Sequence, residues 1–188
     1  MSTPEQYSIS QYIEDLRRIS ENAIDESEIL EKVGAKAKRL STESGWIESR
    51  FYRPDEETGF SAFLLHEEED HSLAVLAVSW APGMGVGPHD HGTWAVVVGV
   101  DGVERNTRYK RLDDRSNSGY AELEVKDESS AGPGDLVRIR TGGIHSVNND
   151  SDKVTLSLHT YGTHINHTLR SQYDLEARTA KEFKVDIN

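Results

Sequence analysis

Residues 87–92 read Gly-Pro-His-Asp-His-Gly, so two histidines, His89 and His91, stand one residue apart. In an extended strand, residues two apart point to the same face, and these two imidazoles can therefore lie side by side. A third histidine, His145, ends the stretch Gly-Asp-Leu-Val-Arg-Ile-Arg-Thr-Gly-Gly-Ile-His at 134–145. If its strand pairs nearby, three neutral nitrogens meet and leave positions open for substrate. The spacing therefore predicts a catalytic metal centre.

Short runs of β-branched and aromatic residues surround these histidines. They predict strands at 60–66, 73–80, 94–100, 104–112, 121–125, 136–139 and 154–161. Turn sequences such as Asp101-Gly102 separate the runs. Many short strands with regular turns predict an all-β sandwich or barrel.

The residues that precede the strands have helical spacing. Apolar positions recur from Ile9 to Ala23, and a second helix is predicted to begin near Asp25, with Glu28 three residues later as a capping signal. We expect both helices to pack against the sheet of the same domain. A cap or partner-binding surface is the alternative.

Composition limits the classes of function. The 188 residues carry a formal net charge of −12, which disfavours nucleic-acid binding, and contain no cysteine, which excludes disulfides and thiolate metal sites. The length predicts one domain over 1–188, with a helical segment at 1–45 and a β-barrel at 46–188. No signal peptide or membrane-length apolar run is evident, so we expect a cytoplasmic protein without a membrane partner. A homodimer is left open.

The histidine stretches resemble the two motifs of the cupin superfamily. In the first, Gly85 to Gly102, the H-x-H pair matches, while Ala95 or Val96 stands where cupins usually carry a glutamate ligand. In the second, Gly134 to Asn149, the glycines, His145 and the asparagine fall in register, and Arg140 replaces a proline. The resemblance implies a double-stranded β-helix barrel of antiparallel strands. Without the glutamate, three histidines would form one face of an octahedron and leave three positions free.

Ser157, His159 and Tyr161 alternate along a predicted strand and share one face. Such a face would let His159 orient the Tyr161 hydroxyl, although a buried polar network with a purely structural purpose has the same pattern.

Combined with three histidines, this strand resembles the thiol dioxygenases, the group of cysteine dioxygenase and 3-mercaptopropionate dioxygenase. The similarity runs from about Phe60 to Tyr161. It implies that His89, His91 and His145 hold Fe(II), that Ser157, His159 and Tyr161 face the metal, and that O2 oxidises a small-molecule thiol to a sulfinate. Zinc, nickel, cobalt and copper also suit imidazole ligands. A three-histidine cupin oxygenase that cleaves a carbon–carbon bond in a diketone is one alternative, and a metal-binding or sensing module without turnover is another.

Two positions depart from the thiol dioxygenase pattern. Val96 stands where animal cysteine dioxygenases have a cysteine that is crosslinked to the tyrosine, so that crosslink cannot form. Ala62 or Phe63 stands where family members that bind a substrate carboxylate have an arginine, and Arg50 and Arg53 are the nearest substitutes. The resemblance therefore predicts a substrate that lacks this carboxylate or has it held differently.

The sequence also predicts where several other aromatic and charged residues lie. Trp94 either covers the pocket or belongs to the core. Arg138 and Arg140 share a strand face and are expected in solvent, with an anion site in the pocket as the alternative. His164 and His167 are expected to be exposed, with a second metal site as the alternative. The acidic run Glu67 to Asp70 is predicted to be a solvated hairpin loop, and the histidines on either side of it, His66 and His71, receive no function.

Overall fold

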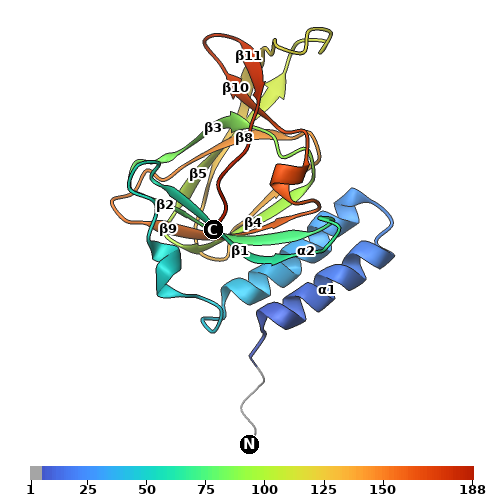
Figure 1. Ribbon diagram of the computed structural model, residues 1–188, viewed down its shortest axis with the longest axis vertical. Helices are drawn as coiled ribbons and strands as arrows, with labels where there is room; N and C mark the ends of the chain where they lie inside the picture. The colour runs from blue at the N-terminus through green and yellow to red at the C-terminus, as the bar shows by residue number, and fades with distance from the viewer. Residues whose placement is uncertain (1–5) are drawn as a thin grey trace, which may run out of the picture.

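The computed structural model describes residues 6–188, in which two helices precede a barrel of two facing β-sheets (Figure 1). The helices are α1 (Ile9–Asn22) and α2 (Glu26–Ser41), with 3₁₀ turns η1 (Ser49–Tyr52) and η2 (Ile165–His167). The strands are β1 (Phe60–Glu67), β2 (Ala74–Trp80), β3 (Gly85–His89), β4 (Ala95–Asp101), β5 (Glu104–Arg111), β6 (Leu123–Ala131), β7 (Leu136–Ile139), β8 (Ile144–Asn148), β9 (Thr155–Tyr161), β10 (Ser171–Asp174) and β11 (Thr179–Glu182).

The strands form a five-stranded sheet in the order β1-β2-β9-β4-β7 and a six-stranded sheet in the order β11-β10-β3-β8-β5-β6. Neighbouring strands within each sheet run antiparallel. The register between β3 and β8 sets His89 opposite His145. The predicted all-β architecture with two N-terminal helices is confirmed.

The helices begin where the sequence predicts and cover the outer face of the five-stranded sheet (Figure 1). The Asp25 side chain caps α2 by accepting a hydrogen bond from the backbone N–H of Glu28 at 2.9 Å. Val33 and Leu40 on α2 pack in one buried cluster with residues of β4 and β9. Full burial of such a side chain contributes about 1.5–3 kcal/mol, so the contact between α2 and the sheet stabilises the fold.

Both faces of β9 are buried, and they differ in chemistry. Leu156 and Leu158 belong to the cluster beneath the helices. Ser157, His159 and Tyr161 alternate with them and therefore point into the barrel. The helices thus make it possible for this strand to present three polar side chains to the barrel interior while its other face stays apolar.

Six of the seven predicted strands are confirmed with ends that shift by at most a residue: β1, β2, β4, β5, β7 and β9. The run at 121–125 instead overlaps the start of the longer β6, which begins at Leu123. The structure adds β3, β8, β10 and β11, and it corrects one detail, because β3 ends at His89 and His91 lies in the bend after it. The acidic run forms the turn between β1 and β2, but Glu68 is partly buried and pairs with Arg17 rather than being fully solvated.

Within residues 6–188, neither α-helix has the length and apolar character that crossing a bilayer requires.

Candidate metal centre

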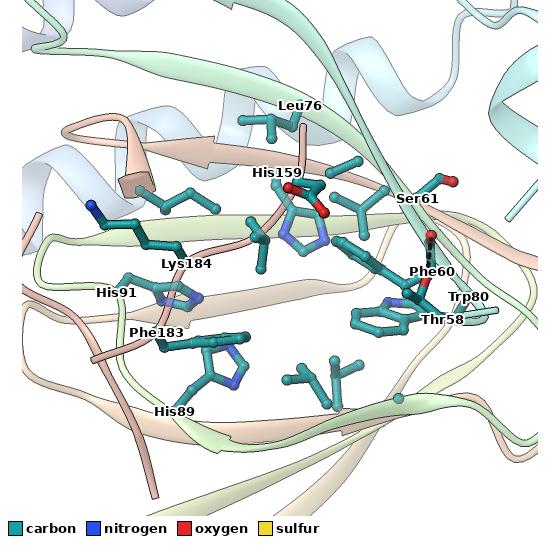
Figure 2. Close-up of a pocket in the computed structure, with 18 of the residues that line it drawn as sticks. Thr58, Phe60, Ser61, Leu76, Trp80, His89, His91, His159, Phe183 and Lys184 are labelled. Atoms are coloured by element: carbon teal, nitrogen blue, oxygen red, sulfur yellow. Dashed lines mark hydrogen bonds between the residues drawn. The ribbon is translucent and has the colours of Figure 1, made fainter. Parts of the chain in front are cut away.

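Three histidine rings meet between the two sheets. The ring centroids of His89 and His145 are 4.6 Å apart, those of His89 and His91 5.0 Å, and those of His91 and His145 5.1 Å. One ligand nitrogen from each ring lies within 4.8 Å of the other two. All three side chains are buried, and Figure 2 shows the rings of His89 and His91 in the pocket beside Phe183. The predicted residues are therefore brought together.

Hydrogen bonds orient two of these rings. His89 Nδ1 donates to the carbonyl oxygen of Gly87 at 2.9 Å, and His145 Nδ1 pairs with Asn106 Oδ1 at 3.3 Å. Both partners are acceptors, so each Nδ1 carries the proton and each Nε2 keeps a free lone pair. His145 Nε2 and His91 Nδ1 are buried without a hydrogen-bond partner among the described residues. Orphaned buried nitrogens are rare, and a metal ion is the ligand that would satisfy them, so the residues fit such an ion.

The environment keeps these histidines neutral. Burial is the main cause that lowers the pKa of His89 and of His91 well below the usual value, and the neighbouring imidazole charges add to it. Burial, together with the Arg170 and Arg108 charges, lowers the pKa of His145 to about 3. Neutral imidazole is the form that binds a metal ion, so the free site is already in the ligating state at pH 7.

The backbone beside His91 depends on a glycine. Gly92 has φ +66°, in the left-handed region, and an added Cβ would lie 2.8 Å from the Thr168 side chain. That close approach lets the Thr168 hydroxyl donate to the carbonyl oxygen of His91 at 2.7 Å. The loop after β9 thereby fixes the bend that carries His91.

The polar face of β9 forms a hydrogen-bonded chain. Ser157 Oγ lies 2.9 Å from His159 Nε2, and His159 Nδ1 lies 2.8 Å from the Tyr161 hydroxyl. The Tyr161 ring lies 5.1 Å from the ring of His91, between centroids. Burial lowers the pKa of His159 to about 3 and raises that of Tyr161, so both side chains are neutral near pH 7.

Sequence reasoning missed the residue at the start of this chain. Glu104, the first residue of β5, is buried and accepts hydrogen bonds from Ser157 Oγ at 3.1 Å and Thr155 Oγ1 at 2.9 Å. Burial raises the pKa of Glu104 to about 7. A lone glutamate at a strand start gives no distinct sequence signal, because its partners belong to a strand about fifty residues later.

The protonation state of Glu104 sets the direction of the whole chain. When Glu104 is ionised, Ser157 donates to it, His159 Nε2 donates to Ser157, and the Tyr161 hydroxyl donates to His159 Nδ1. When Glu104 is protonated, it can donate to Ser157, every bond reverses, and the Tyr161 O–H is free to donate into the pocket. An ionised Glu104 thus directs the Tyr161 O–H towards His159, whereas a protonated Glu104 permits it to donate towards the metal centre.

A cavity of about 540 Å³ opens beside the three histidines. Arg170, which sequence reasoning also missed, lines it; its guanidinium lies 4.3 Å above the ring of Phe183. Arg170 is 3% exposed, and its Nε and Nη1 have no hydrogen-bond partner among the described residues. Arg50 and Arg53, the substitutes suggested by the sequence, are absent from the described lining, so Arg170 is the arginine that faces this pocket.

Two other sequence expectations are resolved. Arg138 and Arg140 are solvent-exposed, as expected, and neither lines the pocket. They donate to the carbonyl oxygen of Leu30 and the hydroxyl of Ser27 on α2. Trp94 packs against the core beneath the helices.

The prediction for the loop histidines is right for one and wrong for the other. His167 is exposed, whereas His164 is buried at 6% exposure because its segment folds back onto the β1–β2 turn.

Comparison with known proteins identifies the fold family. Residues 4–172 match the family model "Cysteine dioxygenase type I". Among solved structures, an oxalate oxidase in complex with glycolate is 16% identical, with a TM-score of 0.47, and the match covers 63% of this chain and 59% of that one. The DMSP lyase DddQ from Ruegeria pomeroyi is 18% identical, with a TM-score of 0.46 and coverage of 66% and 57%. A cupin superfamily protein from Desulfitobacterium hafniense is 15% identical, with a TM-score of 0.42 and coverage of 61% and 82%. The match spans about three fifths of the oxalate oxidase chain.

Proposed function

This chain belongs to the cysteine dioxygenase type I family, a cupin family, and we propose that it is a metal-dependent dioxygenase that oxidises a small-molecule thiol to a sulfinate. The observation that carries the proposal is the convergence of three neutral imidazoles on one point opposite the Ser157–His159–Tyr161 chain. Three ligands on one side leave the other side for substrate.

We propose Fe(II) as the metal, held by His89, His91 and His145. When bound, Fe(II) supplies the redox chemistry that lets dioxygen react with a thiolate. In the balanced reaction, a thiolate and O2 give a sulfinate: both oxygen atoms end on sulfur, sulfur loses four electrons and dioxygen gains them. The reaction therefore needs no external reductant, and the protein's task is to bind, orient and hold protons.

Tyr161 is proposed to place its hydroxyl against the reacting atoms. His159 fixes that hydroxyl at 2.8 Å, and Ser157 in turn fixes His159. The high pKa of the buried Tyr161 keeps the proton on the phenol oxygen, so the group acts as a hydrogen-bond donor to developing negative charge rather than as an anion.

Arg170 supports a narrower substrate class, namely a thiol that carries a carboxylate. A buried guanidinium with two unpaired nitrogens needs an anionic partner, and a carboxylate is the partner that its planar fork fits. Ala62, in place of an arginine, lines the same cavity and leaves that wall apolar. We therefore propose that the carboxylate is bound from the side of Arg170, held differently from the family pattern.

Oxygen uptake tests the proposed reaction. The Fe(II)-loaded protein is supplied with 3-mercaptopropionate, cysteine, cysteamine and a β-diketone, and products are analysed by mass spectrometry under ¹⁸O2. We expect uptake with all three thiols, fastest with the carboxylated ones, and two ¹⁸O atoms in each sulfinate. Uptake with the diketone alone would support the carbon–carbon cleaving alternative, and no uptake with any compound would support a binding module.

The Arg170→Gln variant tests the substrate class. Loss of a charge-assisted, two-pronged contact is expected to raise KM for 3-mercaptopropionate by about 100-fold while leaving cysteamine oxidation almost unchanged. Arg140→Gln is the matched control, because that arginine binds Ser27 away from the cavity. Equal losses with both thiols would show that Arg170 does not recognise the carboxylate.

A further inference from the structure

A second group of histidines gathers outside the barrel, where the loop after β9 meets the turn between β1 and β2. Glu67, His164 and His167 each offer one ligand atom, and these atoms lie within 4.8 Å of one another. His167 is the last residue of the short turn η2, drawn in orange in Figure 1, and His164 caps the start of that turn. Glu67 is the last residue of β1. None of the three is a ligand of the centre described above.

The backbone holds the two segments together without any metal. The N–H of His164 donates to the carbonyl oxygen of His71 at 2.9 Å, and the N–H of His167 donates to that of His164 at 2.8 Å. The rings of His71 and His167 stack at a centroid distance of 3.5 Å and an interplanar angle of 12°. The fold itself therefore brings the ligand groups close together. This preorganisation lowers the entropic cost of binding a metal ion.

Two acceptor atoms face each other at the centre of this group. His164 Nδ1 accepts the N–H of Asn166 at 3.3 Å, which marks it as the unprotonated ring nitrogen. Glu67 Oε1 lies 3.9 Å from that nitrogen, too far for a hydrogen bond. A cation with bonds of about 2.0–2.2 Å to each atom would fit this separation, and it would replace the Asn166 N–H as the partner of the one lone pair on His164 Nδ1.

His71 completes the arrangement behind the carboxylate. Its Nδ1 lies 2.5 Å from Glu67 Oε1, which fixes the orientation of that carboxylate. Hydrogen-bonded support of this kind typically accompanies ligating carboxylates in metal sites. His164 is 6% exposed, and burial lowers its pKa, so its ring is neutral at pH 7, as a ligand must be.

We propose that Glu67, His164 and His167 form a second binding site for a divalent transition metal of the zinc class, with His71 as the group that orients the carboxylate. Two imidazoles and one carboxylate are the ligand set that Zn²⁺ accepts, with water in the fourth position. The metal would join the β1–β2 turn to the loop that carries Thr168 and Arg170 towards the pocket. The proposal does not depend on the proposed function.

Metal titration tests the second site. The three-histidine centre is first filled anaerobically with one equivalent of Fe(II), and Zn²⁺ is then added while native mass spectrometry counts bound ions and calorimetry measures the Kd. We expect one further Zn²⁺ per chain. The variants His167→Gln and Glu67→Gln are expected to weaken this binding at least 100-fold, and His71→Gln about 10-fold, without loss of the iron.

The control is His66→Gln, because His66 sits beside the same turn but pairs with Glu68 and offers no ligand to the group. It should bind the second ion as the wild type does. A crystal soaked in Zn²⁺ should also show an anomalous peak among Glu67, His164 and His167. The proposal is overturned if the wild type binds no ion beyond the iron, or if His167→Gln and Glu67→Gln bind the second ion as tightly as His66→Gln does.

Discussion

Burial determines which protonation state each polar side chain of the pocket adopts. The imidazoles of His89, His91 and His159 lose their charged form because desolvation outweighs any nearby acceptor. Burial likewise raises the pKa of the Glu104 carboxyl to about 7, so this group titrates near neutral pH. The buried histidines and Tyr161 of the pocket are thus neutral, and Arg170 is the one buried cation among the described lining residues.

The first residue-scale prediction concerns the pH profile of activity. With a pKa of about 7, Glu104 changes the direction of the chain that ends at Tyr161 within the physiological range. If donation by Tyr161 assists the reaction, the wild-type kcat falls as pH rises from 6 to 8. Glu104→Gln, which cannot ionise, should have no inflection near pH 7. The control is Glu124→Gln on the exposed face of β6, which should keep it. An unchanged inflection in Glu104→Gln would assign it to another group.

The same carboxyl predicts a pH dependence of stability. Its folded pKa of about 7 lies above the model value of 4.5, so the folded state holds the proton more tightly than the unfolded state. The stabilisation is present below pH 4.5 and is lost as pH rises through 7. Between pH 5 and pH 8 the wild type should lose about 2–3 kcal/mol of unfolding free energy more than Glu104→Gln does. Urea unfolding at both pH values measures this difference, and parallel losses in the two proteins would contradict it.

At the residue scale, the sequence reveals groups that lie in short motifs and hides those assembled by distant pairing. His89, His91 and His145 are recognisable from their short motifs, although His91 lies after the end of β3. Ser157, His159 and Tyr161 are recognisable because residues two apart on a strand share a face. Arg170 and Glu104 carry no local pattern. Each becomes a pocket or network residue only through contacts with strands far away in the sequence, which a single sequence does not encode visibly.

At the scale of the element, β9 contacts the helices with one face and the pocket with the other. Its leucines bind the helices and its polar residues face the pocket, so one strand supports both the core and the site. Other elements were hard to predict for physical reasons. β3 reads Gly-Val-Gly-Pro-His and has only one strand-forming residue, Val86. β6 is an edge strand with polar residues on both faces and has no clear alternation.

Truncation of β9 on its helix side tests this dual role. Leu158 is fully buried, so Leu158→Ala should lower the unfolding free energy by about 2–5 kcal/mol through lost burial and a residual cavity. The matched control is Leu169→Ala, because Leu169 is 94% exposed and should change stability by less than about 0.5 kcal/mol. Chemical denaturation provides the comparison; a loss in Leu158→Ala no larger than in the control would show that the strand does not depend on the helices.

At the scale of the whole molecule, the helices are part of the barrel's core rather than an appendage. Tyr12 on α1 reaches the hydroxyl of Thr160 on β9 at 2.6 Å, and α2 packs along the same sheet. We therefore predict that residues 6–188 unfold as one unit. Calorimetry should show a single transition whose van't Hoff and calorimetric enthalpies agree, and a chain lacking residues 1–45 should not fold. Two separate transitions would mean that the helices and barrel are independent.

The proposed dioxygenase depends on one metal ion bound by three imidazoles inside the barrel. Diffraction from crystals of the Fe(II)-loaded protein, collected on both sides of the iron absorption edge, measures this directly. We predict an anomalous peak about 2.0–2.2 Å from one nitrogen each of His89, His91 and His145, and none in crystals of His89→Ala. An iron peak elsewhere, or none in the wild type, would contradict the metal centre and with it the proposed dioxygenase.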